Sequence, residues 1–183
     1  MNKKELRDEM KRKRAELSKS CAREMSLQIC ENFANTELYK NAKSLGLYMS
    51  IRNEVDLSHL INRAFADKKR VFVPITDKDN KDIELFEITG DMSFCVGDFG
   101  IKVPEKKIKC EGVDVMLVPG LGFSFHGARV GWGGGYYDRL IPKMSAVTVG
   151  VCYEFQLVGT IETEPHDLFM NYILTESEMV ICD

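Results

Sequence analysis

Apolar positions at helical spacing mark three segments of the chain. The first spans residues 3–17, the second runs from Ser18, which stands where an N-cap is expected, to about Phe33, and the third spans 56–68. Their apolar faces carry Leu6, Met10 and Leu17 in the first segment and Leu57, Leu60, Ile61, Ala64 and Phe65 in the third. The pattern predicts three amphipathic helices.

Short apolar runs between these helices predict strands. Six segments show the pattern: 43–50, 71–75, 83–88, 113–118, 146–152 and 172–175, the last strand expected. Several of them are apolar on both faces, as strands of a buried parallel sheet are. Because strands alternate with helices, we expect an α/β fold. The prediction is a single domain over residues 1–183, with a mostly parallel central sheet and helices on both faces.

The connections between the predicted strands carry turn and glycine signals. Residues 77–82 form a polar turn, and 97–104 are expected to be a loop. A glycine-rich stretch, 120–135, follows the most apolar strand at 113–118 and precedes a short helix expected over 136–144. In open α/β sheets, ligands bind beyond the carboxyl ends of strands. The glycine-rich stretch therefore lies where a ligand site is expected.

This glycine-rich stretch has the chemistry of an anion site. Four of the residues from 131 to 135 are glycine, so several backbone N–H groups can converge on one anion, helped by the positive end of a helix starting near Tyr136. Arg129 offers a planar fork for phosphate oxygens, and Asp138 offers a hard oxygen for Mg²⁺. The alternative is a turn that binds nothing. Neither G-x-x-x-x-G-K-[ST] nor G-x-G-x-x-G after a strand occurs here, so phosphate binding would use another scheme.

Charge adds a second pointer to an anionic ligand. The chain carries a net charge of −3, which argues against a surface devoted to nucleic acid. Residues 1–14 nevertheless hold seven basic side chains against three acidic ones. Four of the basic residues form a stripe beside the apolar face of the first helix: Lys3, Arg7, Lys11 and Arg14. The stripe either points into a cleft or forms a solvated helix face.

Composition indicates an ordinary globular protein of the cytoplasm. Of the 183 residues, 44% are hydrophobic and 29% are charged, with no run long enough to span a membrane. The six cysteines are scattered without a CxxC pair or zinc-like spacing, which is typical of a reducing compartment. Charged residues through the first 16 positions argue against a signal peptide. We expect a monomer that binds small molecules, with neither nucleic acid nor membrane as a partner.

The segment 127–139, Gly-Ala-Arg-Val-Gly-Trp-Gly-Gly-Gly-Tyr-Tyr-Asp-Arg, resembles the hallmark motif of the 5-formyltetrahydrofolate cyclo-ligase (methenyltetrahydrofolate synthetase) family. The preceding Pro-Gly-Leu-Gly-Phe at 119–123 matches the residues that come before that motif in the family. Three weaker matches follow the family order: Lys-Lys-Glu-Leu-Arg at 3–7, Glu-Val-Asp at 54–56, and His166-Asp167 with Thr175-Glu176. The resemblance thus spans nearly the whole chain.

The resemblance implies a reaction and its co-substrates. The family converts 5-formyltetrahydrofolate to 5,10-methenyltetrahydrofolate, with ATP split to ADP and phosphate in the presence of Mg²⁺. The formyl oxygen attacks the γ-phosphate, the neighbouring ring-bridging nitrogen attacks the activated carbon, and phosphate leaves. This chemistry needs positioning and charge neutralisation more than a protein nucleophile. No Ser/His/Asp or Cys/His arrangement stands out in the sequence, which agrees with that scheme.

The resemblance also assigns site residues, each with a plainer alternative. Arg129 would be catalytic, Asp138 and Asp167 would hold Mg²⁺, and folate would contact Met49, Glu54, Trp132 and Tyr136. ATP would contact Lys3, Lys4, Glu5, Leu6, Arg7, Arg129, Val130, Gly131, Trp132, Gly133, Gly134, Gly135, Tyr136 and Tyr137. The alternatives are a solvated helix face for Lys3 and Arg7, core packing for Met49 or one tyrosine, a surface turn for Asp167 and a helix N-terminus for Glu54. His166 would be structural.

Three positions depart from the family pattern. Trp132 and Gly134 stand where some members carry Arg or Lys, so neutralisation of phosphate would depend more on Lys3, Arg7, Arg129 and Mg²⁺. Asn171 stands where the family often has Asp, so a role of this position in supporting the metal site is in doubt.

Two other kinds of function stay open from the residues alone: a sugar-phosphate isomerase or acyl-CoA transferase, and a non-catalytic nucleotide-binding module. ATP-dependent product formation from formyl-folate separates them from a cyclo-ligase.

Overall fold

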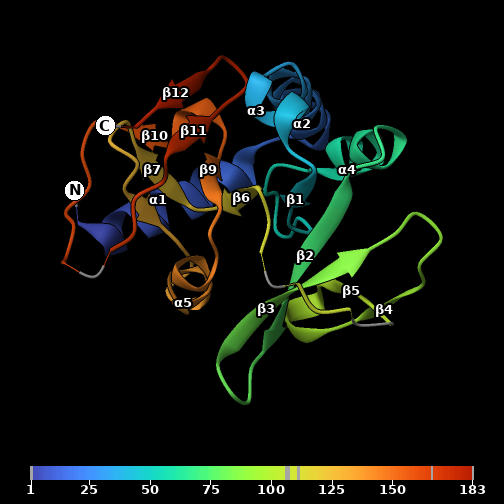
Figure 1. The fold of residues 1–183 in the computed structure, drawn as a ribbon. Helices are drawn as coiled ribbons and strands as arrows, with labels where there is room; N and C mark the ends of the chain where they lie inside the picture. The colour runs from blue at the N-terminus through green and yellow to red at the C-terminus, as the bar shows by residue number, and fades with distance from the viewer. Residues whose placement is uncertain (1, 106–107, 111, 166, 183) are drawn as a thin grey trace.

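A seven-stranded sheet forms the centre of the protein (Figure 1). The computed structural model describes residues 2–105, 108–110, 112–165 and 167–182. The strand order is β12-β11-β9-β6-β1-β2-β3. The five inner strands run parallel, and β12 and β3 pair antiparallel at the two edges. The predicted α/β fold with a mostly parallel central sheet is confirmed.

The elements alternate along the chain as the apolar pattern predicts. The main sheet contains β1 (Ser44–Gly46), β2 (Arg70–Asp77), β3 (Asp82–Ile88), β6 (Val115–Pro119), β9 (Val147–Val151), β11 (Tyr172–Leu174) and β12 (Met179–Ile181). Two small sheets contain β4 (Phe94–Val96) with β5 (Lys102–Pro104), and β10 (Leu157–Val158) with β7 (Gly122–Ser124) and β8 (Arg129–Val130). The helices are α1 (Lys3–Glu16), α2 (Lys19–Ala34), α3 (Glu37–Asn41), α4 (Ser58–Ala66) and α5 (Tyr136–Leu140), with 3₁₀ turns at Asp98–Gly100, Ile141–Lys143 and Glu154–Gln156.

Side-chain caps define the first two helices. Asn2 and Glu5 form a capping box at the start of α1, in which the Asn2 side chain accepts the Glu5 N–H at 2.9 Å. Ser18 is the N-cap of α2, as predicted, and its hydroxyl accepts the N–H of Cys21 at 3.2 Å. Both caps satisfy backbone groups that a helix start leaves unpaired.

Alternate residues of the strands divide between two clusters of buried side chains. In β6, Val115 and Leu117 belong to a cluster with the side chains of α2, α3 and α4. The intervening Met116 and Val118 belong to a second cluster, which includes Leu140 of α5. This alternation is what a strand with both faces buried requires. A third, smaller cluster joins α1 to the sheet of β7 and β8 through Leu6, Met10, Leu121, Ala128, Val130 and Ile161.

Several predicted boundaries are wrong, each for a local reason. The expected strand 43–50 ends at Gly46, and the helix expected over 136–144 ends at Leu140, because Pro142 cannot continue it and a 3₁₀ turn follows. The loop expected over 97–104 includes β5, which pairs with β4, and the glycine-rich stretch includes β7 and β8. Strand β12 follows the expected last strand and pairs antiparallel with β11. In the part of the chain that the structure describes, no helix is long and apolar enough to cross a membrane.

Candidate active site

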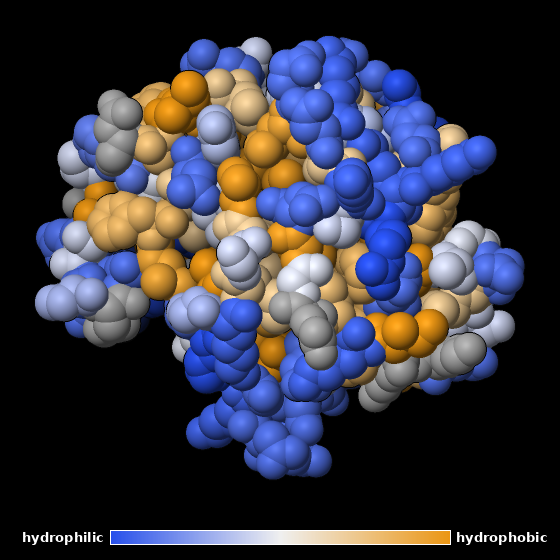
Figure 2. Space-filling view, in the orientation of Figure 1, coloured by the Kyte–Doolittle hydropathy of each residue, from blue (hydrophilic) through white to orange (hydrophobic). Residues whose placement is uncertain are grey.

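A cavity of about 1070 Å³ lies beyond the carboxyl ends of the central strands. Tyr48 and Met49, just after β1, and Pro119, at the end of β6, line it. This is where the topology of an open α/β sheet predicts a ligand site. On the face of the molecule shown in Figure 2, apolar residues are exposed across the middle and on the left, and hydrophilic residues gather at the bottom and at the upper right.

Helix α1 supplies a basic wall to this cavity. Lys3, Arg7 and Lys11 line it, so the predicted basic stripe does point into a cleft. Arg7 Nε donates a hydrogen bond of 2.9 Å to the carbonyl oxygen of Gly131, which ties the helix to the glycine-rich loop. The wall therefore faces the loop that was expected to bind an anion.

Arg14, the fourth residue of the stripe, is buried and organises the loop after β1. Its Nε donates to the carbonyl oxygen of Asn53 at 3.1 Å, and its Nη2 donates to that of Arg52 at 2.6 Å. Arg52 and Asn53 have φ angles of 49° and 58°, in the left-handed region that costs energy for residues with a Cβ. Burial lowers the pKa of Arg14, and Glu54 opposes that shift. The guanidinium thus holds a strained loop that ends at Glu54.

The glycine-rich loop forms the opposite wall. Gly133 and Gly135 have φ angles of 99° and 65°, which favour glycine, and Gly135 is the residue before α5. Residues 131 to 138 all line the cavity, so the loop and the start of α5 face it continuously. Because α5 has only five residues, the helix end contributes less positive charge than the expected longer helix would.

Arg129 lies at the base of this loop with its side chain only 8% exposed. Its Nε donates to the carbonyl oxygen of Pro119 at 2.9 Å, and its Nη1 lies 3.5 Å from Asp138 Oδ1. The guanidinium carbon also lies 5.1 Å from the centre of the Tyr137 ring. Burial lowers the pKa of Arg129, and the carboxylate of Asp138 opposes that shift. The fork is therefore held in a fixed orientation at the cavity wall.

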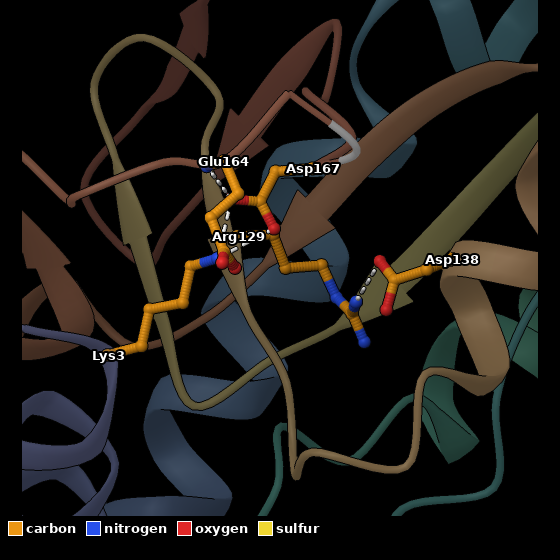
Figure 3. A network of polar contacts seen from close by, with 5 residues as sticks. All are labelled: Lys3, Arg129, Asp138, Glu164 and Asp167. Atoms are coloured by element: carbon orange, nitrogen blue, oxygen red, sulfur yellow. Dashed lines mark hydrogen bonds and ion pairs between the residues drawn. The ribbon is translucent and has the colours of Figure 1, made fainter.

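Three acidic side chains, Asp138, Glu164 and Asp167, line this part of the cavity (Figure 3). Lys3 extends toward Asp167 and Glu164, donating to Asp167 Oδ1 at 2.8 Å and to Glu164 Oε2 at 3.0 Å, whereas Arg129 extends toward Asp138. Partial burial lowers the pKa of Lys3, but its hydrogen bonds to Asp167 and Glu164 raise it overall. Lys3 therefore stays charged and balances the two acids.

The donor set fits a magnesium ion that takes most of its ligands from elsewhere. Among the described residues, no three His, Cys, Asp or Glu side chains gather in a way that could hold a metal. Asp138 and Asp167 nevertheless line the same cavity and offer hard carboxylate oxygens. Mg²⁺ keeps several waters and is commonly bound through one or two carboxylates with substrate phosphates. His166 lies outside the described residues.

Trp132 and Glu54 line the cavity and are hydrogen-bonded to each other. Trp132 Nε1 donates to Glu54 Oε1 at 3.1 Å, and the backbone N–H of Ile51 donates to Glu54 Oε2 at 3.1 Å. Three cations surround the indole ring, with the Arg52 guanidinium 4.9 Å, the Arg14 guanidinium 5.5 Å and the Lys11 ammonium 5.6 Å from its centre. Burial raises the pKa of Glu54, although these hydrogen bonds and the charge of Arg14 oppose the shift. Trp132 is thus an uncharged side chain surrounded by three cations and one carboxylate.

The structure brings together most of the predicted site residues. Four of them do not line the cavity: the side chains of Lys4 and Glu5 are exposed, and Leu6 and Val130 are each 1% exposed in the third hydrophobic cluster. Asn171 also lies away from the cavity, where its Oδ1 accepts the N–H of Thr148 at 2.8 Å. It therefore joins the ends of β9 and β11.

Sequence reasoning missed several residues that line the cavity: Tyr48, Ile51, Arg52, Phe99, Ile101, Arg139 and Glu164. Phe99 and Ile101 come from the β4–β5 hairpin, and the Phe99 ring lies 6.0 Å from that of Tyr136 in an edge-to-face arrangement. Among the described residues, β4 and β5 pair only with each other, so nothing local in the sequence predicts that this hairpin reaches α5. For Tyr48, the sequence offered one indication of a place in the site: the residue is next to Met49, which the family resemblance assigns to folate.

Comparisons with known proteins find relatives along nearly the whole chain. A family model described as the 5-formyltetrahydrofolate cyclo-ligase family matches residues 1–176. A Caenorhabditis elegans protein named as a probable 5-formyltetrahydrofolate cyclo-ligase is 28% identical over 197 residues, covering 99% of this chain and 96% of its own. The solved structure of Aquifex aeolicus 5,10-methenyltetrahydrofolate synthetase is 31% identical, covers 99% of this chain and 93% of its own, and superposes with a TM-score of 0.88.

A second solved structure supports the fold alone. The 5,10-methenyltetrahydrofolate synthetase of Mycoplasma pneumoniae is 24% identical, covers 96% of this chain and 99% of its own, and has a TM-score of 0.78. The family model spans nearly the whole chain, and relatives that cover 99% of the chain are named 5-formyltetrahydrofolate cyclo-ligase or 5,10-methenyltetrahydrofolate synthetase. The protein is therefore an enzyme that belongs to the 5-formyltetrahydrofolate cyclo-ligase family.

Proposed function

We propose that this enzyme converts 5-formyltetrahydrofolate to 5,10-methenyltetrahydrofolate and splits ATP to ADP and phosphate. The observation that carries the proposal is one cavity lined by two chemically different sets of residues. Lys3, Arg7 and Arg129 line it together with the glycine-rich loop, which suits a polyphosphate. The buried Glu54, held by Trp132, lines it as well, which suits a flat heterocycle with N–H groups.

ATP would lie along α1 and the glycine-rich loop. Lys3, Arg7 and Arg129 neutralise its phosphates, and the N–H groups of 131–135 converge on them. Tyr136 and Tyr137 lie beside the nucleotide. The remaining predicted contacts, Lys4, Glu5, Leu6 and Val130, do not line the cavity, and Asn2 already accepts the backbone N–H groups of Lys4 and Glu5, so the proposal places these residues beside the nucleotide site rather than in it.

Folate would lie in the part of the cavity that Glu54 lines. The carboxylate would accept hydrogen bonds from the amino group and ring N–H of the pterin, as a charge-assisted pair. Trp132 holds Glu54 in place and offers a ring face, while Met49 and Tyr136 complete the apolar contacts. Both oxygens of Glu54 already accept one hydrogen bond each and keep a lone pair for the substrate.

The chemistry would then consist of two displacements. The formyl oxygen attacks the γ-phosphorus, and ADP leaves with the electron pair of the broken P–O bond. The nitrogen at position 10 attacks the activated formyl carbon and loses its proton, and the C–O bond breaks, so phosphate leaves with the former formyl oxygen. The protein supplies positioning and positive charge, with Arg129 as the catalytic cation.

Mg²⁺ would be held by Asp138 and Asp167 and, when bound, neutralises charge on the phosphate oxygens. Asp138 faces Arg129, and Asp167 faces Lys3, so each carboxylate already has a cation as its neighbour. The ionic partners keep both carboxylates at the wall of the cavity.

The remaining expectations belong to this proposal. The chain would act as a monomer and as a single domain, with its sheet covered on both faces. The division of the strand residues between two hydrophobic clusters, one with α2, α3 and α4 and one with α5, supports that arrangement. The enzyme would act in the cytoplasm on small molecules, without nucleic acid or membrane as a partner. Its six cysteines are scattered along the sequence without a CxxC pair, which agrees with a reducing compartment.

An isotope experiment tests whether the formyl oxygen of the substrate is transferred to the released phosphate. Substrate labelled with ¹⁸O in the formyl group is converted with unlabelled ATP, and the released phosphate is analysed by mass spectrometry. We expect one ¹⁸O in each phosphate and one ADP for each methenyl product. Unlabelled phosphate would reject attack by the formyl oxygen, and product without ADP would reject the role of ATP.

A further inference from the structure

Tyr48 carries a buried hydroxyl group at the wall of the cavity. The residue follows β1, is 3% exposed and lines the cavity. Its hydroxyl has no hydrogen-bond partner in the part of the chain that the structure describes. A buried polar group without a partner costs free energy, and such groups are rare in folded proteins. An unpaired hydroxyl that borders a cavity indicates that its partner enters with a ligand.

The surroundings of Tyr48 decide the direction of that hydrogen bond. Burial raises the pKa of Tyr48 well above its ordinary value, and the negative charge of Glu54 raises it further. The hydroxyl therefore keeps its proton at neutral pH and can donate it. Glu54, when ionised, can only accept. The same part of the cavity thus offers one donor and one acceptor to a ligand.

We propose that Tyr48 determines specificity by donating a hydrogen bond to the 4-oxo group of the pterin ring. This inference rests on the proposed function, because it takes the ligand to be a formylated reduced folate. One edge of that ring presents a 2-amino group, an N3–H and the 4-oxo oxygen, in the order donor, donor, acceptor. Glu54 accepts from the two donors, so the adjacent acceptor needs a protein donor. Tyr48 supplies it.

The sulfur analogue of the substrate isolates this contact. In a 4-thioxo analogue of 5-formyltetrahydrofolate, the ring keeps the two donors for Glu54, but sulfur is a weak acceptor. The dissociation constants of both ligands are measured by calorimetry for the wild type and for Tyr48→Phe. We expect the variant to bind 5-formyltetrahydrofolate about tenfold more weakly, and the thioxo analogue less than about twofold more weakly. The affinity for ATP should not change.

Thermal unfolding separates this effect from damage to the fold. Phenylalanine fills the same volume and removes only a hydroxyl that lacks a partner in the free protein, so Tyr48→Phe should melt at or above the wild-type temperature. Tyr39 is an equally buried control, because its hydroxyl donates to Asp67 at 2.8 Å. Tyr39→Phe should melt at a lower temperature and bind folate as the wild type does.

Each contrary outcome has a distinct meaning. Unchanged binding of 5-formyltetrahydrofolate by Tyr48→Phe would overturn the role of Tyr48 and leave the proposed function intact. Equal weakening of both ligands, or a melting temperature lowered as in Tyr39→Phe, would also overturn it. A wild type that neither binds nor converts 5-formyltetrahydrofolate would reject the proposed function, and this inference with it.

Discussion

Trp132 Nε1 and Glu54 Oε1 lie 3.1 Å apart, and this hydrogen bond joins the glycine-rich loop to the loop after β1. The two residues are 78 positions apart in the sequence. Residues of both loops line the cavity, the first loop being proposed to contact ATP and Glu54 of the second to contact folate. The contact therefore couples the two halves of the proposed site.

Loss of the indole N–H should weaken folate binding selectively. Trp132→Phe keeps an aromatic ring among the three cations but cannot hold Glu54, so we expect the dissociation constant for 5-formyltetrahydrofolate to rise about fivefold. The affinity for ATP should stay within about twofold. Calorimetry measures both constants, and unchanged folate affinity would contradict a positioning role for Trp132. Because Trp132 is the only tryptophan, its fluorescence should also change when folate binds to the wild type.

Folate binding should strengthen as the pH rises above the ordinary glutamate range. Burial raises the pKa of Glu54, so the folded protein keeps the proton over a pH interval in which the unfolded chain has lost it. The charge of Glu54 therefore destabilises the free protein as the pH rises through that interval. A ligand that donates N–H groups favours the ionised form and offsets this cost.

Titrations from pH 5 to 8 test this dependence. The wild type should bind 5-formyltetrahydrofolate more tightly as the pH rises, whereas Glu54→Gln should bind at least about tenfold more weakly at pH 7.5 and vary less with pH. Glu87→Gln is the control, since Glu87 pairs with Arg70 away from the cavity. The same pH profile in Glu54→Gln and the wild type would exclude Glu54 as the titrating group.

Arg129 should be needed for turnover in a way that charge alone does not replace. Arg129→Lys keeps the charge but loses the planar fork and the hydrogen bond to Pro119, so we expect kcat to fall about 100- to 1000-fold. Arg70→Lys, at an exposed ion pair with Glu87, should keep the wild-type kcat and change stability little, because exposed ion pairs contribute little to it. Steady-state kinetics measure kcat for both variants, and a fall in kcat of less than about tenfold in Arg129→Lys would contradict the catalytic role.

Asp167 should determine how much Mg²⁺ the enzyme needs. Asp167→Asn removes a charged oxygen ligand, so the Mg²⁺ concentration that gives half-maximal rate should rise about tenfold. Asp82→Asn is the matched control, because Asp82 forms a surface ion pair with Lys143 at 3.0 Å. If the two variants show the same Mg²⁺ dependence as the wild type, Asp167 does not hold the metal.

The apolar pattern predicted the elements that carry strong periodic signals. Strand β9 lies inside the expected segment 146–152, and β6 overlaps the segment 113–118 and ends one residue beyond it. Both strands were predictable because they are buried on two faces and read as continuous apolar runs. The basic stripe of α1 was predicted from spacing alone and does face the cavity through Lys3, Arg7 and Lys11. These features depend on local sequence.

The missed features depend on contacts between distant segments. Phe94 and Val96 of β4 are exposed, so their strand has no buried face to produce an apolar pattern. Tyr48 belongs to an apolar run that predicts a strand through residue 50, and only the fold shows that β1 ends at Gly46 and that Tyr48 borders the cavity. The family resemblance supplied most of the predicted site residues, but not other residues that line the cavity, such as Arg52 and Phe99.

The proposed reaction is tested most directly by the absorbance of the methenyl-folate product. Purified enzyme is mixed with 5-formyltetrahydrofolate, Mg²⁺ and ATP, and a parallel sample lacks ATP. We predict that the product band rises only in the presence of ATP and that Arg129→Ala abolishes the rise. A folded wild-type protein that binds ATP but forms no product, or forms it equally without ATP, would contradict the proposed ATP-dependent cyclisation.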